Sequence, residues 1–168
     1  MIEGEKVILK RKSVDDARNE YEWRRDPEIS ELDGASPLSI PFSLFLPTFL
    51  WEISTSGDRN FSIYTKDGKH IGSCMYYNLD ERNKEAEIGI IIGDKSYWGK
   101  GYGRDAVKSL VKYLADEKGL RKIKLRTLPT NERAIRCFKS CGFEGKGRVR
   151  GRDGEFLLME LDLSKIRA

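Results

Sequence analysis

The stretch Trp98-Gly99-Lys100-Gly101-Tyr102-Gly103-Arg104 is the most informative part of this chain for its fold. Glycine at every second position allows a tight turn in which successive backbone N–H groups line one concavity. An isoleucine-rich run at 86–92 precedes it and an amphipathic run at 104–118 follows it, which predicts a buried strand and then a helix. The unpaired N–H groups at the start of that helix would extend the concavity. The stretch is therefore typical of a loop that binds a diphosphate.

Spacing excludes the two best-known phosphate-binding loops. A P-loop ends in Gly-Lys-Ser/Thr, whereas Lys100 is followed by Gly101 and then by neither Ser nor Thr. The dinucleotide-binding pattern G-x-G-x-x-G, begun at Gly99, requires glycine at 104, where this chain has Arg104. The alternative without a ligand is a loop that is rich in glycine for packing alone.

The sequence around this loop predicts a single α+β domain over residues 1–168 with a mixed central sheet. Apolar alternation and turn signals predict about seven strands, at 6–10, 61–63, 71–79, 86–92, 123–127, 143–149 and 155–163. Helical spacing predicts about four helices, from near 14 to before Pro27, at 43–54 with an interruption at Pro47, at 104–118 and at 132–140. Residues 31–41 are predicted to be a loop.

Composition is that of a soluble globular protein, with 39% hydrophobic and 35% charged residues. The net charge of +4 is too small and too dispersed to indicate a nucleic-acid partner. The most apolar stretch, 40–53, contains two prolines and a glutamate, which argues against a membrane span, and residues 1–11 are too charged for a signal peptide. Three cysteines form no disulfide framework, so a cytoplasmic location is expected.

Two ordered blocks carry a family resemblance. The segment 98–103, following Ala86-Glu87-Ile88-Gly89-Ile90, resembles the coenzyme A signature of the GNAT acetyltransferases, in particular the branch that acetylates ribosomal-protein N-termini and spermidine. Residues 131–143 match a second block, and 23–28 match near the front. The resemblance covers nearly the whole chain. It implies an N-acetyltransferase that moves an acetyl group from acetyl-coenzyme A to a primary amine by direct attack in a ternary complex, without a metal.

The resemblance also implies where the cofactor binds. In such enzymes the fourth strand, here 86–92, is splayed from the fifth, here 123–127, and its free backbone pairs with the pantetheine arm. A bulge near Gly89 would supply the kink. The diphosphate would rest on the N–H groups from 99 to 104, with Lys100 and Arg104 adding charge, and Asn131 would contact the pantetheine from the opposite side. The cofactor residues implied are Ile90, Ile91, Ile92, Trp98, Gly99, Lys100, Gly101, Tyr102, Gly103, Arg104, Asn131 and Phe138.

For the chemistry, the resemblance implies Glu87 as the base that removes the amine proton, directly or through water. The alternative for Glu87 is a carboxylate that is merely solvated or paired on a sheet face. Phe138 stands where many family members have a tyrosine that protonates the departing thiolate. Since a thiol of pKa about 8.5 can leave as the anion, this loss need not abolish catalysis. Tyr76, Tyr77 and Tyr102 are candidate replacements, and the substrate contacts implied are Trp23, Arg24 and Glu28.

Other features receive simpler interpretations. Cys137 and Cys141 lie four residues apart, but with His70 as the lone histidine they are interpreted as buried thiols rather than metal ligands or a nucleophile. The basic cluster at Lys146, Arg148, Arg150 and Arg152 either attracts an acidic partner or protects a strand edge.

Two further functions stay open from the sequence. One is a coenzyme A sensor that has lost its chemistry, favoured by Phe138, and the other is a nucleotide-binding protein. The acceptor remains open among peptide N-termini, polyamines, aminoglycosides and small metabolites. A homodimer is compatible with the resemblance.

Overall fold

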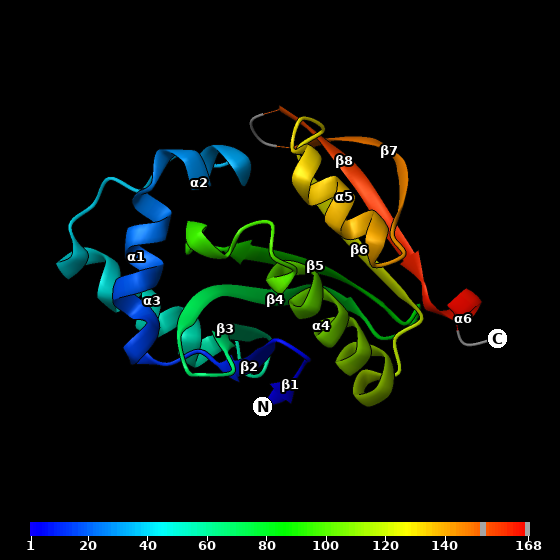
Figure 1. Ribbon diagram of the computed structural model, residues 1–168, viewed down its shortest axis with the longest axis horizontal. Helices are drawn as coiled ribbons and strands as arrows, with labels where there is room; N and C mark the ends of the chain where they lie inside the picture. The colour runs from blue at the N-terminus through cyan, green and yellow to red at the C-terminus, as the bar shows by residue number, and fades with distance from the viewer. Residues whose placement is uncertain (152–153, 167–168) are drawn as a thin grey trace.

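A computed structural model describes residues 1–151 and 154–166. Its described strands form one sheet in the order β1-β2-β3-β4-β5-β6-β8-β7 (Figure 1). Neighbouring strands are antiparallel except for β5 and β6, which are parallel. The strands are β1 (Ile2–Glu3), β2 (Val7–Arg11), β3 (Asn60–Thr65), β4 (His70–Asp80), β5 (Glu85–Ile92), β6 (Lys122–Thr127), β7 (Glu144–Gly151) and β8 (Gly154–Asp162).

The helices form two groups around the sheet. In Figure 1, α4 and α5 lie on the viewer's side of the sheet. The other group, α1, α2 and α3, lies at the opposite end of the molecule from β7 and β8. No helix in the described ranges has the length and apolar character needed to cross a membrane. The helical segments are η1 (Val14–Asp16), α1 (Ala17–Arg25), α2 (Pro27–Leu32), α3 (Phe42–Thr55), η2 (Lys95–Tyr97), α4 (Tyr102–Lys118), α5 (Glu132–Ser140) and α6 (Leu163–Ile166).

The main core lies between α4 and the sheet. The apolar stripe of α4, including Val107, Leu110 and Leu114, is fully buried against strand residues such as Ile71 and Ile123. Helical spacing of these side chains is the reason that 102–118 folds as a helix on this face. A second cluster of Ala17, Tyr21, Phe45 and Phe49 holds α1 to α3.

The sheet opens between β5 and β6. These strands pair only through Glu85–Glu87 and Lys122–Lys124, so the backbone of β5 from Ile88 onward has no strand on that side. Since β1 has only two residues, β5 and β6 are the fourth and fifth of the longer strands. The predicted α+β fold, with a mixed sheet splayed at this point, is confirmed.

Three local predictions are wrong. Residues 31–32, predicted to begin a loop, are the last two residues of α2, whereas 33–41 is a loop as predicted. The helix forms because Asp26 accepts hydrogen bonds from the N–H groups of Glu28 and Ile29, and Pro27 fits the first helical position. Pro47 does not interrupt α3, which packs through Phe45 and Phe49 onto α1 on either side of the proline.

The third error concerns the bulge. The β4–β5 register shifts between Tyr77 and Asp80, not at Gly89, and Asn78 takes up the extra residue with φ +50°. Asparagine tolerates this left-handed conformation better than most residues. The turn between β7 and β8 includes 152–153, which lie outside the described residues, and so does Arg152 of the basic cluster.

Candidate active site

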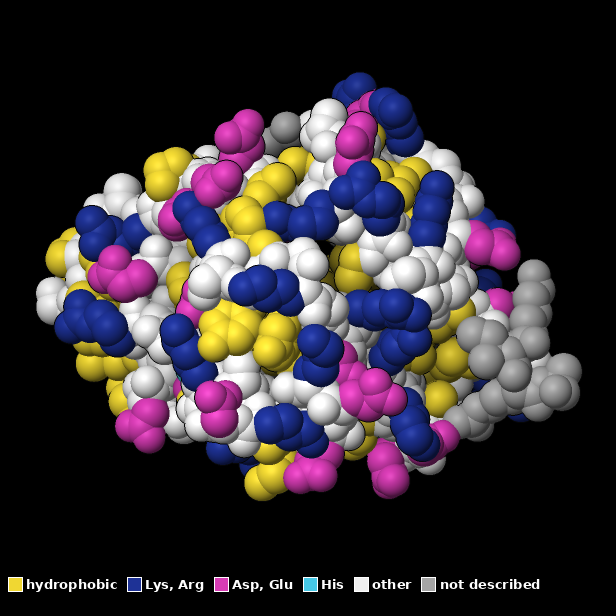
Figure 2. Space-filling view, viewed as in Figure 1, with side chains coloured by type: hydrophobic (Ala, Val, Ile, Leu, Met, Phe, Trp, Pro, Cys, Tyr) yellow, Lys and Arg dark blue, Asp and Glu magenta, His cyan; other side chains and the backbone are white. Residues whose placement is uncertain are grey.

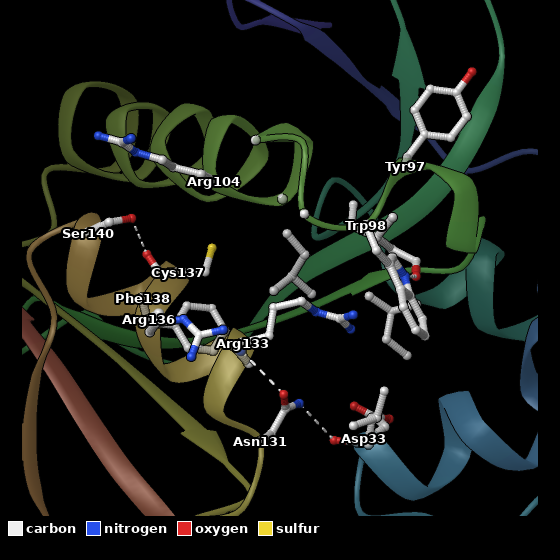
Figure 3. A pocket seen from close by; sticks show the side chains of 18 of the residues that line it. Asp33, Tyr97, Trp98, Arg104, Asn131, Arg133, Arg136, Cys137, Phe138 and Ser140 are labelled. Atoms are coloured by element: carbon white, nitrogen blue, oxygen red, sulfur yellow. Dashed lines mark hydrogen bonds between the residues drawn. The ribbon is translucent and has the colours of Figure 1, made fainter.

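A cleft of about 470 Å³ lies at the opening of the sheet (Figure 3). Its walls are the free edge of β5, the glycine loop with the start of α4, one side of α5, and the end of α2. Of the predicted cofactor residues, those whose atoms line it are Ile90, Ile91, Ile92, Trp98, Gly99, Gly101, Gly103, Arg104, Asn131 and Phe138. The structure thus brings together ten of the twelve.

The glycine loop has the geometry of an anion cradle. Gly99 and Gly101 adopt φ of +71° and +88°, and Gly101 is the N-cap of α4, so the backbone turns sharply into the helix. The first N–H groups of α4 have no intrahelical acceptor and point toward the cleft end of the helix. A Cβ at Gly103 would lie 3.5 Å from the Ile92 side chain, so the protein alone leaves room there.

The other two predicted loop residues lie behind the cradle. Tyr102 packs edge-on against Tyr97, with ring centroids 4.9 Å apart, and Lys6 lies over its ring at 4.8 Å. The Lys6 ammonium also donates a hydrogen bond to the Lys100 carbonyl at 3.0 Å. Lys100 and Tyr102 therefore support the loop without lining the cleft.

Trp98 connects the two sides of the cleft. Its indole N–H donates to the Ile92 carbonyl at 2.7 Å, and the Arg133 guanidinium from α5 lies 3.9 Å from its ring (Figure 3). Arg133 and Arg136 also line the cleft, together with Arg104. Lys and Arg side chains surround the middle of this face (Figure 2). Arg133 and Arg136 were not among the predicted site residues, although their three-residue spacing on a helix puts them on one face.

Asn131 joins α5 to α2. Its side-chain oxygen accepts from the Ala134 N–H at 3.2 Å and so caps α5, and its amide donates to the Leu32 carbonyl at 3.4 Å. Phe138, buried on α5, lines the cleft as an apolar wall.

Two further cavities adjoin the cleft. A second one, of about 410 Å³, lies toward β4 and β6 and shares with the cleft the side chains of Leu32, Asp33, Ile90, Asn131, Ala134 and Phe138. A third, of about 290 Å³, lies on the opposite face of β5 from α4 and shares Ile29, Asp33 and Ile91 with the cleft. Asp33 lines all three and was missed, because no local pattern in the sequence indicates that a carboxylate in this loop reaches a cavity.

Glu87 lies beside the second cavity. It accepts hydrogen bonds from the Asn78 amide at 3.1 Å and from Arg126 Nε at 3.3 Å, and it is paired with the Tyr77 hydroxyl. Burial pushes the pKa of Glu87 up, but these hydrogen bonds and the charge of Arg126 outweigh burial and hold the pKa below its usual value. The carboxylate is therefore ionised at neutral pH. Tyr77 and Arg126 line the second cavity, whereas Glu87 lies behind them.

The structure separates the three candidate tyrosines. Tyr76 is buried, with its hydroxyl 3.5 Å from Asp58, away from the cleft. Tyr102 lies behind the loop, so Tyr77 is the one of the three that lines a cavity next to the cleft. Burial and the neighbouring Glu87 raise the pKa of Tyr77, which keeps its hydroxyl protonated.

The predicted substrate contacts are more scattered. Trp23 and Arg24 line the third cavity, where Trp23 packs on His70 at 4.7 Å and Arg24 pairs with Glu52 at 3.4 Å. Glu28 is exposed and pairs with Lys95 at 2.8 Å, so the structure does not bring it to the three cavities.

The cysteines and the basic strand contribute little to this site. Cys137 lines the cleft, and Cys74 is buried in the core, where burial raises its pKa to about 12. Within the part of the chain that the structure describes, no group of three His, Cys, Asp or Glu side chains is arranged to hold a metal. Lys146 and Arg148 on β7 pair with Glu144 and Glu155, each at 3.4 Å.

Comparison with known proteins identifies the family. Residues 6–144 match the model of the acetyltransferase (GNAT) domain. The chain is 28% identical over 149 residues to an uncharacterised N-acetyltransferase, p20, of Bacillus licheniformis, with 87% of this chain and 83% of the relative covered. It is 30% identical over 170 residues to the aminoglycoside N(6')-acetyltransferase type 1 of Klebsiella pneumoniae, with 93% of this chain and 83% of the relative covered.

Solved structures of acetyltransferases have the same fold as this chain. The aminoglycoside acetyltransferase AAC(6')-Ib in complex with coenzyme A has a TM-score of 0.77 at 25% identity, over 96% of this chain and 99% of that one. Spermidine N-acetyltransferase from Vibrio cholerae, with coenzyme A and spermine, shares the fold with a TM-score of 0.83 at 21% identity, over 96% and 98%. The chain therefore belongs to the GNAT family and is an acetyl-coenzyme A-dependent N-acetyltransferase.

Proposed function

We propose that the protein acetylates a primary amine of a small molecule by direct attack on acetyl-coenzyme A in a ternary complex. The observation that carries this proposal is the pair of adjoining cavities at the free edge of β5, which share Ile90, Asn131 and Phe138 as a common wall. Two substrates entering from different sides would meet at this wall. Relatives named for aminoglycosides and spermine support a small-molecule amine as the acceptor.

The residues of the cleft fit the co-substrate. The backbone of 90–92 is free to pair with the amides of the pantetheine arm, as an added strand would. The N–H groups from 99 to 104 suit the diphosphate, and Arg104, Arg133 and Arg136 supply positive charge beside it. When bound, acetyl-coenzyme A supplies an activated thioester. A backbone N–H of β5 near Ile90 would stabilise the oxyanion, and each such donor contributes roughly 3 kcal/mol.

Tyr77 and Glu87 would handle the protons. An amine of pKa about 10 must lose a proton before it attacks, and Glu87 is ionised and hydrogen-bonded to the Tyr77 hydroxyl that faces the cavity. A proton passed through Tyr77 reaches Glu87 without Glu87 entering the cavity. The same hydroxyl is the candidate donor to the departing thiolate, in the role that Phe138 cannot perform.

A coenzyme A sensor is the second candidate, and Phe138 is the observation that favours it. Thiol release from acetyl-coenzyme A across peptide N-termini, polyamines and aminoglycosides separates the two functions. We expect turnover with one class of small amine. Coenzyme A binding by calorimetry without turnover on any amine would favour the sensor, and turnover restricted to peptides would contradict the small-molecule acceptor.

A further inference from the structure

Asp33 occupies the point where the three cavities meet. It follows the last residue of α2 and is held there by a turn in which the Gly34 N–H donates to the Glu31 carbonyl and the Ala35 N–H to the Ser30 carbonyl. Figure 3 shows Asp33 across the cleft from Arg104 and α4. The side chain is accessible from the open cavities, so a ligand in any of them can reach it.

The local fold gains nothing from a carboxylate at this position. A negative charge at the C-terminal end of a helix faces the negative end of the helix dipole, which is unfavourable. Among the described residues, no donor hydrogen-bonds to the Asp33 carboxylate and no cation lies within ion-pairing distance of it. The backbone N–H of Asp33 caps α2, but among the described residues its carboxylate takes part in neither capping nor pairing.

Three of the cations that line a cavity together with Asp33 are paired with other carboxylates, whereas Arg104, Arg133 and Arg136 line the cleft on the side of α4 and α5. Lys12 pairs with Glu20 at 3.1 Å, Arg24 pairs with Glu52 at 3.4 Å, and Arg126 bonds to Glu87. The positive charge of Arg24 acts on Asp33 from a greater distance and only partly opposes the surrounding protein, which raises the pKa of Asp33 to about 6. At neutral pH this carboxylate is ionised and accessible.

The charges divide the cleft into two ends. Arginines line the end near α4 and α5, where an anionic co-substrate fits. Asp33 is the one acidic side chain among the described residues that line the first two cavities. The acceptor end therefore attracts a positive group.

We propose that Asp33 binds a second ammonium group of the acceptor and so selects a diamine or polyamine over a monoamine. The anchored group is a second cation, because pairing with a carboxylate would hold the proton on a reacting nitrogen and oppose its attack. The other amine loses its proton, its nitrogen forms the C–N bond with the acetyl carbon, and the C–S bond breaks. The thiolate takes up a proton as the amide nitrogen loses its own.

This inference rests on the proposed function, so the test compares substrates within one assay. Steady-state rates are measured for α,ω-diamines and for monoamines of the same chain length with three proteins: wild type, Asp33→Asn and the control Glu31→Gln. Glu31 is exposed on the same helix and lines none of the three cavities. Calorimetry of coenzyme A binding checks that each variant folds with an intact cleft.

We expect wild type and Glu31→Gln to prefer the diamine through a lower KM. Asp33→Asn should lose that preference, with a KM for the diamine raised roughly tenfold to a hundredfold and kcat unchanged. Equal KM values for diamine and monoamine in wild type would overturn the inference while leaving the acetylation of amines in place. So would an Asp33→Asn variant that loses kcat alone. Absence of turnover on every amine would instead contradict the proposed function.

Discussion

At the scale of single residues, the proposed chemistry depends on a hydrogen-bonded pair, Tyr77 and Glu87, placed on neighbouring strands. Their register is direct, since Tyr77 lies opposite Glu87 across β4 and β5. The bulge that follows Tyr77 turns the Asn78 amide onto Glu87 at 3.1 Å. The pair therefore combines the protonated hydroxyl of a residue that lines the cavity with an ionised carboxylate hydrogen-bonded to it, as proton transfer through Tyr77 requires.

Replacing Tyr77 tests this arrangement. We expect Tyr77→Phe to lower kcat by about 10²-fold with the KM for acetyl-coenzyme A unchanged, because one proton-transfer group is lost and the cleft is not. The measurement is steady-state kinetics with the acceptor found above. Tyr76→Phe, altered on the other side of β4, serves as the control and should retain kcat. Full activity in Tyr77→Phe would show that the thiolate leaves without this donor.

Glu87 has a matched neighbour in Glu85, which lies on the same face of β5 and pairs with Lys124 at 3.1 Å. We expect Glu87→Gln to lower kcat more at pH about 7 than at pH about 9, because more of an amine of pKa about 10 is already neutral at the higher pH. Glu85→Gln loses a comparable ion pair and should keep the wild-type kcat at both pH values. The check is a pH–rate profile; an equal loss at both pH values for Glu87→Gln would indicate a structural role.

Asp33 gives a stability prediction with a definite sign. Its pKa of about 6 in the folded protein lies above the value of about 3.9 expected for an unfolded chain. The folded state therefore binds more protons between these values, and stability falls as the pH rises through this window. Asp33→Asn should raise Tm at pH about 7 and leave it unchanged below pH about 4.

The effect should be a few °C at most, since the carboxylate is accessible to solvent. Thermal unfolding at the two pH values, with Glu31→Gln as control, measures this change in Tm. A lower Tm for Asp33→Asn than for wild type at neutral pH would contradict the prediction. The charged and titratable groups that line cavities together with Asp33 include Lys12, Glu20, Arg24, Tyr77, Arg104, Arg126, Arg133 and Arg136.

At the scale of elements, α4 begins and ends on a glycine in the left-handed conformation. Gly101 has φ +88° at the N-terminal end in the cleft, and Gly119 has φ +65° at the C-terminal end away from it. We expect Gly101→Ala and Gly119→Ala each to lose about 1–2 kcal/mol of unfolding free energy, because alanine is strained there. Only Gly101→Ala should weaken coenzyme A binding, by roughly tenfold or more, since its backbone forms the cradle.

Denaturant unfolding and calorimetry on the two variants separate these effects. Equal coenzyme A affinity in Gly101→Ala and Gly119→Ala would remove the cradle from the binding site. The N-terminal strand supports the same end of α4, because Asp105 in its first turn accepts from the N–H groups of Glu5, Lys6 and Val7 at 2.7–3.1 Å. The loop is therefore fixed from behind by a segment nearly a hundred residues away.

At the scale of the whole molecule, the cleft is crossed by two contacts, Trp98 with Arg133 and Asn131 with the Leu32 carbonyl. Residues of α2, α4 and α5 line the cleft, so a ligand bound there would contact helices of both groups. We expect coenzyme A at about 100 times its Kd to stabilise the fold by about 2.7 kcal/mol, a Tm rise of roughly 5–11 °C for a chain of this size. Thermal unfolding with and without the ligand measures this, and Gly101→Ala should show a smaller rise at the same concentration.

The sequence alone was sufficient for the parts of this protein that depend on local pattern. Helical and alternating apolar spacing predicted α4, α5 and the seven longer strands, and the glycine spacing predicted the loop between β5 and α4. These features depend on near neighbours in the chain, so periodicity and turn chemistry are enough. The signals for α2, with Asp26 before Pro27 and Gly34 beyond its end, were also present, although this helix was not predicted.

Only the tertiary structure decided which polar side chains meet. Tyr77 lines a cavity while Tyr76 faces the core, and Glu87 is paired with Arg126. Asp33 joins three cavities whose walls include residues of α1, α2, α4, α5, β4, β5, β6 and β8. These relations depend on strand register, on one bulge and on packing between residues far apart in the chain. A shift of one residue in register turns a side chain to the other face, and no local pattern in the sequence specifies that shift.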